Sequence, residues 1–205
     1  MESLLAAAVT LVWALSLVGN QWPSRLGFTL HGGWVGAAVA LHVGALVFSV
    51  VEAGRLPLDS MRFGLHALGL WVVLGWVWLR SQPRMESLGG LLLGLAVLIQ
   101  AVAQLAPTHG GGTAREGLWF PAHVSLILLG LGGLALSFSL SVVFLWVQRR
   151  LKAKRFDGLA RLPSLDILDR RNYQAMSFGF VSLTAGMAVG GCGRPPTPRP
   201  RWARR

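Results

Sequence analysis

Six hydrophobic runs without any Asp, Glu, Lys or Arg make up most of this 205-residue chain, and short polar segments separate them. The runs cover residues 4–19, 30–51, 63–79, 88–105, 124–147 and 175–191. A helix needs about 20 mostly apolar residues to cross the hydrocarbon core of a bilayer. The pattern therefore predicts one transmembrane helix for each run, although the first and last runs are short. A cleaved signal peptide is the alternative for the first run, but Glu2 stands where such peptides are basic.

The composition indicates the same class of protein. Hydrophobic residues make up 53% of the chain and charged residues 13%, and the mean hydropathy is +0.55. Soluble domains carry about 25% charged residues. We expect an all-α fold, a polytopic transmembrane helical bundle of about six spans, with no separate soluble domain. Cys192 is the single cysteine, which excludes an intrachain disulfide and a cysteine-based metal cluster.

The basic residues are distributed unequally between alternate loops, which predicts the orientation. One set of loops holds Arg25, Arg80, Arg84, Arg149, Arg150, Lys152, Lys154, Arg155, Arg161, Arg170 and Arg171, and the other holds Arg55, Arg62 and Arg115. Loops rich in Lys and Arg stay in the cytoplasm. We expect a multi-pass protein of the bacterial inner (cytoplasmic) membrane with its N-terminus outside. The net charge of +11 then reflects topology and contact with anionic lipid, not nucleic acid.

Two polar segments interrupt this simple pattern. In residues 149–172, leucines alternate with charged residues, and Pro163, Ser164 and Asp166 suit the start of a short helix lying in the membrane interface. The tail 192–205 contains four prolines and five arginines among its residues CGRPPTPRPRWARR. Such a basic tail contradicts the orientation of the other loops. We expect residues 1–191 to form the transmembrane domain and the tail to be disordered or derived from a frame shift near Gly190.

Histidines are the candidate functional residues, because the hydrophobic runs contain no other ionisable group. A neutral imidazole can be buried and is a ready ligand for iron. His42 lies inside the second run, either as an axial haem ligand or hydrogen-bonded to a neighbouring helix. His123 lies at the outer surface beside Trp119 and Phe120, either as a haem ligand or as an interfacial residue that caps the fifth run. His66, His31 and His109 are expected to be structural or solvated.

The same patterns exclude several classes of function. The intramembrane segments lack the carboxylates that a proton-coupled transporter or an ion pump requires. We find no spacing typical of a nucleophilic triad, a P-loop or a zinc site, so no catalytic residue is predicted.

Two stretches resemble the CcsA and HemX type of cytochrome c assembly protein. They are HVSLILLGLGGLALSFSLSVVFLW from His123 and LPSLDILDRRNYQAMSFGFVSLTAGMAVGG from Leu162, and ALHVGALVFSV around His42 is similar to the second span of the HemX-like branch. The resemblance implies a membrane protein that handles haem for attachment to apocytochrome c. It implies His123 as an outer-face axial ligand of the haem iron and His42 as one within the membrane. It also implies apocytochrome c and a second assembly membrane protein as partners.

The resemblance also implies features that are absent from this chain. A tryptophan-rich outer loop and a second outer histidine would follow Gly190 in that family. We therefore expect the front portion of a haem handler, at most a subunit of a membrane haem lyase and not an enzyme on its own. The alternatives are a HemX-like membrane regulator of tetrapyrrole biosynthesis and a haem-free permease subunit.

Overall fold

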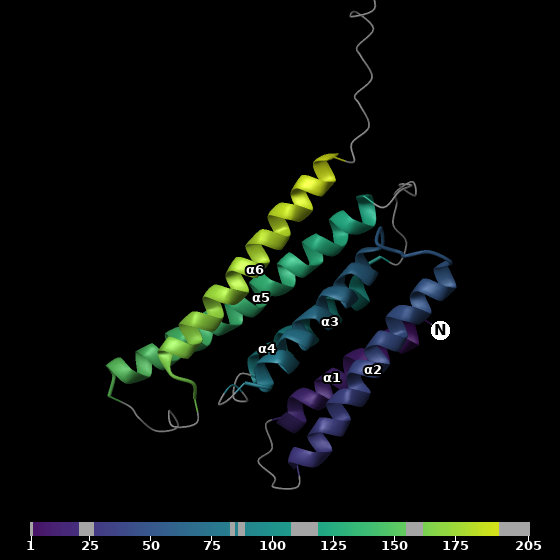
Figure 1. Cartoon of the computed structure of the whole chain (residues 1–205). Helices are drawn as coiled ribbons and strands as arrows, with labels where there is room; N and C mark the ends of the chain where they lie inside the picture. Colours follow the sequence, from purple (N-terminus) through teal and green to yellow (C-terminus); the bar gives the residue numbers. More distant parts are fainter. Residues whose placement is uncertain are drawn as a thin grey trace, which may run out of the picture.

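The computed structural model describes residues 2–20, 27–82, 85, 89–107, 119–154 and 162–192, and the regular structure in these ranges is entirely α-helical (Figure 1). The helices are α1 (Glu2–Asn20), α2 (Gly27–Ala53), α3 (Met61–Arg80), α4 (Gly89–Leu105), α5 (Trp119–Lys152) and α6 (Leu165–Cys192). Each contains one of the six hydrophobic runs. The all-α fold class is therefore confirmed.

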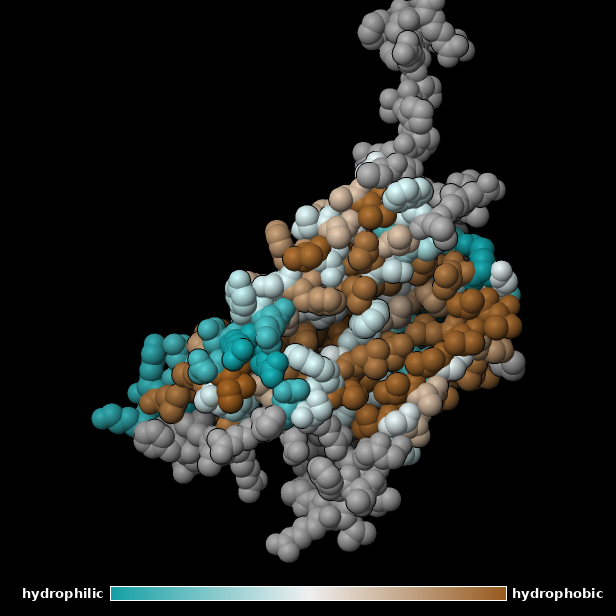
Figure 2. Space-filling view, viewed as in Figure 1, coloured by the Kyte–Doolittle hydropathy of each residue, from teal (hydrophilic) through white to brown (hydrophobic). Residues whose placement is uncertain are grey.

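The lengths and surfaces of these helices are those of a membrane protein. Three described segments are long and apolar enough to cross a bilayer, at Trp34–Ala53, Met61–Leu79 and Trp119–Lys152, and two shorter apolar helices lie at Ser3–Val18 and Gly90–Leu105. Many large apolar side chains point outward from the bundle, as hydrocarbon-facing residues do. Figure 2 shows this apolar surface in brown, with hydrophilic side chains gathered where α5 ends and α6 begins.

The six helices form two groups that α3 joins. Helices α5 and α6 pack along one another as a long antiparallel pair, and α3 packs against both α5 and α4 (Figure 1). Helix α1 packs against α4 and α2. One hydrophobic core runs through both groups; its members include Trp13, Trp76, Leu93, Leu140 and Leu168. This arrangement places the histidines of α2 and α3 in one group and His123 in the other.

Glycines bring α5 and α6 into close contact. A Cβ atom added at Gly133 would lie 2.8 Å from the Cα atom of Gly179, and one added at Gly130 would lie 2.9 Å from the Gly179 carbonyl oxygen. Small residues of this kind let the backbones of two membrane helices approach closely. The pair therefore depends on backbone contact, which no larger residue at these positions allows.

Helix α6 differs from the prediction, because residues 165–191 form one helix instead of an interfacial helix followed by a separate span. The Ser164 hydroxyl accepts a hydrogen bond from the backbone N–H of Ile167 (3.4 Å), as expected of the N-cap. At 1.5 Å per residue, α6 is about 42 Å long and α5 about 51 Å, against about 30 Å of hydrocarbon. Both helices are therefore longer than the hydrocarbon core is thick, and the charged residues of α6 lie in its first turns.

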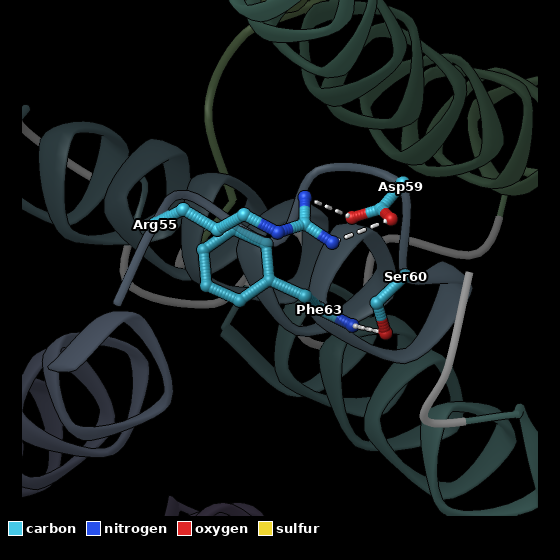
Figure 3. A network of polar contacts seen from close by, with 4 residues as sticks. All are labelled: Arg55, Asp59, Ser60 and Phe63. Carbon is cyan, nitrogen blue, oxygen red and sulfur yellow. Dashed lines mark hydrogen bonds and ion pairs between the residues drawn. The ribbon is translucent and has the colours of Figure 1, made fainter. Parts of the chain in front are cut away.

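The connection between α2 and α3 is fixed by polar contacts (Figure 3). The Arg55 guanidinium donates two hydrogen bonds to the Asp59 carboxylate, at 3.0 and 2.9 Å. This bonding holds the pKa of Asp59 below its usual value, so the carboxylate stays charged. The hydroxyl of Ser60 accepts a hydrogen bond from the N–H of Phe63 (3.4 Å) and caps α3. The turn itself uses Gly54 with a φ of +63°, a conformation that favours glycine.

Several sequence predictions lie outside the described residues. The tail 193–205 and His109 are among them, as is the side chain of His31, while Cys192 is the last residue of α6. The division between a transmembrane domain and a tail therefore stays a prediction.

Candidate functional site

His42 lies at the point where the first four helices meet. Its side chain is fully buried, and it contacts Trp13 of α1, His66 of α3 and Gln100 of α4. The indole Nε1–H of Trp13 donates to His42 Nδ1 at 3.2 Å. His42 Nε2 lies 3.2 Å from the backbone carbonyl oxygen of His66 and 2.9 Å from Nε2 of Gln100. The hydrogen bond to a neighbouring helix, one of the two alternatives for His42, is therefore present.

These contacts determine which nitrogen of His42 carries the proton. A neutral imidazole has one donor and one acceptor nitrogen. Because Nδ1 accepts from Trp13, Nε2 carries the hydrogen and donates to the His66 carbonyl. The oxygen and nitrogen of an amide side chain have nearly the same shape, so the Gln100 amide can be turned by about 180°. Its oxygen then faces His42 Nε2 and accepts a hydrogen bond from it. In this arrangement His42 has no free lone pair.

His66 is the second histidine of this group. Its ring meets that of His42 edge-on, with the centroids 6.1 Å apart, and its Nε2 atom is buried without a hydrogen-bond partner. The Gln100 side-chain oxygen would also be buried without one, and turning the amide as described gives this oxygen the His42 Nε2 hydrogen. A cavity of about 20 Å³, lined by His42, His66 and Arg62 among others, adjoins the rings, and this is enough space for about one water molecule. The four-helix junction is thus a small polar cluster inside an apolar bundle.

His123 occupies a different setting on α5. It is the fifth residue of that helix, so it does not cap the helix as one alternative proposed. Its Nδ1 atom lies 2.7 Å from the carbonyl oxygen of Gly186 on α6. The ring also packs against Gly190, where a Cβ atom would collide with it. The side chain is half-buried, and the glycines of α6 create the space that it fills.

The hydrogen bond to Gly186 fixes the tautomer of His123. A backbone carbonyl only accepts hydrogen bonds, so Nδ1 is the protonated nitrogen and Nε2 keeps its lone pair. Metal-ligating histidines commonly have this arrangement, with one ring nitrogen donating to a carbonyl and the other bound to the metal. His123 therefore has a nitrogen lone pair available for a metal ion, whereas both nitrogens of His42 are hydrogen-bonded.

The structure does not bring the two predicted ligands together. The ring contacts of His42 come from α1, α3 and α4, whereas those of His123 come from α6. Within the described ranges, no group of three or more His, Cys, Asp or Glu side chains is arranged to hold a metal ion. Each histidine is thus a separate candidate, and any second iron ligand has to come from another source.

The partners of His42 were not predicted from the sequence. Trp13 and Gln100 were not singled out, and His66 was expected to be structural without a named contact. An available signal was the depth of these residues, since Trp13, His42 and Gln100 each lie well inside their predicted spans. A hydrogen-bonding side chain at that depth needs a partner on another helix.

Comparisons with known proteins show which family the chain resembles. A sequence model of the family described as "Cytochrome C assembly protein" matches residues 2–192. The "Cytochrome c biogenesis protein CcsA" of Trieres chinensis is 23% identical over 227 aligned residues, which cover 92% of this chain and 70% of that protein. No solved structure matches.

Proposed function

Because this chain belongs to the cytochrome c assembly protein family, we propose that it binds haem through His123 for presentation to apocytochrome c. The family and the similarity to a cytochrome c biogenesis protein support a role in cytochrome c biogenesis. The observation that carries the finer proposal is the 2.7 Å contact between His123 Nδ1 and the Gly186 carbonyl, which leaves Nε2 free to bind iron.

His123 meets the requirements of a haem ligand. Its ring is oriented by α6, so little conformational entropy is lost when Nε2 binds. Its side chain lies near the start of α5 and is half-buried, so it is partly accessible to a ligand. Bound haem would supply the iron for ligation and the vinyl groups for attachment. The protein's own contribution is to fix the position of the imidazole and its tautomer.

His42 is the second proposed ligand, under a stricter condition. Its Nδ1 lone pair accepts the Trp13 indole hydrogen, and its Nε2 faces the His66 carbonyl. Ligation by His42 therefore requires at least one of these hydrogen bonds to break. Loss of a buried hydrogen bond costs about 1–3 kcal/mol when the partner stays unsatisfied. His123 is accordingly the first proposed ligand and His42 the second.

Absorption spectra of the purified protein test this proposal. The wild type, His123→Ala and His42→Ala are isolated from haem-replete membranes, and the Soret band is normalised to the monodisperse protein fraction. We expect His123→Ala to lose most of the band and His42→Ala to keep it in the folded fraction. Loss in His42→Ala alone would assign the iron to His42. A wild type without any band would contradict haem binding and leave the haem-free permease and the HemX-like regulator as alternatives.

The proposed setting is the inner bacterial membrane, with the N-terminus and His123 on the outer side. The excess of basic residues at the opposite end of the bundle supports this orientation, and three of them lie in the last turn of α5. Apocytochrome c and a second assembly membrane protein are the proposed partners on the outer face. The family match supports partners of this kind.

One observation favours the HemX-like regulator as a second candidate. The end of α5 and the start of α6 both carry charged side chains, and such a charged region offers a surface to a soluble partner. Crosslinking from Lys152 to an enzyme of tetrapyrrole synthesis, together with a wild type that binds no haem, would favour the regulator over the assembly factor.

A further inference from the structure

A lateral groove of about 470 Å³ lies between α3 and the α5–α6 pair, separate from both histidine sites. Trp71 and Trp78 of α3 and Phe178 of α6 line it, together with Gly132 and Gly133 of α5. The groove has the size of a small-molecule site and a mostly apolar lining. Neither His42 nor His123 contributes to it.

The shape of the groove suits a hydrocarbon chain. Its residues on α3 extend from Trp71 to Trp78, about 10 Å along the helix axis. One leaflet contributes about 15 Å of hydrocarbon. The aromatic side chains at its edge are 42–54% exposed, so the groove opens sideways toward the position of lipid. A flexible apolar chain from the surrounding leaflet therefore has direct access.

A single cation marks one end of the groove. The Arg171 guanidinium donates hydrogen bonds to the side-chain oxygens of Gln82 (2.8 Å) and Gln174 (3.0 Å) and lies 5.3 Å from the centroid of the Trp78 ring. These partners are neutral, and no carboxylate among the described residues pairs with Arg171. The two glutamines orient the guanidinium without neutralising its charge, which favours an anionic ligand.

We propose that this groove binds an anionic phospholipid, with one acyl chain between α3 and the α5–α6 pair and the phosphate at Arg171. A soluble anion would leave the apolar lining unused, and an uncharged lipid would leave the cation uncompensated. The basic last turn of α5 lies at the same end of the molecule and attracts anionic lipid to it. An anionic phospholipid supplies both an apolar chain for the lining and a negative charge for Arg171.

The position of the groove gives the lipid a structural role. Helix α3 is the main link between the two helix groups, and the groove runs along that link. An acyl chain placed there contacts side chains from α3, α5 and α6 at once. Binding should therefore stabilise the association of the α5–α6 pair with the rest of the bundle.

Lipid retention and thermal stability test the proposal. The wild type, Arg171→Gln and Arg170→Gln are purified in mild detergent, and bound phospholipid is measured by native mass spectrometry. Arg170 is the matched control, because it is exposed and does not line the groove. We expect the wild type and Arg170→Gln to retain phosphatidylglycerol and Arg171→Gln to bind it about fivefold more weakly. Only the first two should unfold at a higher temperature in phosphatidylglycerol nanodiscs than in phosphatidylcholine nanodiscs.

Two further variants keep the test decisive if Arg171→Gln fails to fold. Arg171→Lys retains the charge and should keep the preference for phosphatidylglycerol, whereas Leu74→Trp fills the groove and should displace the lipid. Equal retention in Arg171→Gln and Arg170→Gln would overturn the proposal. A Soret band that is lost in Arg171→Gln but kept in Arg170→Gln would also overturn it, because it would assign the groove to haem.

Discussion

The nitrogen atoms of His42 and His123 are used differently, and this difference decides which ring can bind iron. His123 donates from Nδ1 to a carbonyl and keeps the Nε2 lone pair, whereas His42 accepts an indole hydrogen at Nδ1 and donates from Nε2. Burial in an apolar bundle makes each of these hydrogen bonds costly to lose. At the scale of the residue, His42 therefore acts first as a polar connection between helices.

Replacement of Trp13 by Phe tests this role of His42. The variant keeps the aromatic packing and removes the indole hydrogen bond, which leaves Nδ1 buried without a donor. We expect a loss of about 1–3 kcal/mol in unfolding free energy, measured from thermal or denaturant unfolding in detergent. Trp34→Phe is the control, because it removes the bond to the Ser16 hydroxyl from a side chain that is 46% exposed. An effect of equal size in both variants would contradict the importance of the His42 cluster.

The candidate residues could be predicted from the sequence, but their contacts could not. Histidines stand out because the apolar runs contain no other ionisable side chain. The cluster around His42 joins residues as far apart as Trp13 and Gln100, and hydropathy along the chain contains no information on such distant pairs. The contact between His123 and the Gly186 carbonyl could not be predicted either, because every residue has a backbone carbonyl.

The α5–α6 pair depends on backbone contact at the scale of the helix. Gly130, Gly133 and Gly179 meet where any side chain would collide with backbone atoms of the opposite helix. The same pair carries His123 and its carbonyl partner. The separation of α5 and α6 therefore sets both the packing of the helices and the position of the proposed ligand.

Replacement of Gly179 by Ala tests this dependence. The added Cβ atom would lie 2.8 Å from the backbone nitrogen of Leu134, so the helices must move apart. We expect a destabilisation of about 1–3 kcal/mol, measured as a lower thermal midpoint. Gly44→Ala on α2 is the matched control, since no atom lies within 4 Å of its Cβ position. That control should be neutral or slightly stabilising, because alanine favours helix more than glycine does. Equal midpoints for both variants would refute the close contact.

The helices were predicted more accurately than their extensions. The hydrophobic runs identified each helix in the described part of the chain, because burial and lipid contact both select apolar residues. The continuity of α6 was missed because its first turns contain Asp166, Asp169 and Arg170, which indicate a surface helix when read alone. The chain stays helical there, since Leu168 packs into the core while the charged side chains remain exposed.

The distribution of basic residues between the two ends of the bundle predicts the orientation of the molecule in a membrane. The α2–α3 connection and the end of α5 lie at opposite ends of the bundle (Figure 1). Under the positive-inside rule, the described basic residues in the last turn of α5 predict that this end of the bundle lies in the cytoplasm. With this predicted orientation, His123 would face outward, on the side where we propose that apocytochrome c is met.

Cysteine labelling tests this orientation. In a Cys192→Ser background, Leu56→Cys lies in the α2–α3 connection and Lys152→Cys lies at the end of α5. We expect a membrane-impermeant maleimide to label only Leu56→Cys in spheroplasts and to label both after lysis. Labelling of Lys152→Cys in intact spheroplasts would reverse the topology and place His123 on the cytoplasmic side.

Rescue by free imidazole is the most direct test of haem ligation by His123. His123→Ala leaves space beside Gly186 and Gly190 that an imidazole molecule fits, so the missing ligand can be supplied from solution. We expect His123→Ala to lack the wild-type Soret band, and added imidazole to restore the band at the wild-type wavelength. An unchanged Soret band in His123→Ala without imidazole would contradict the account.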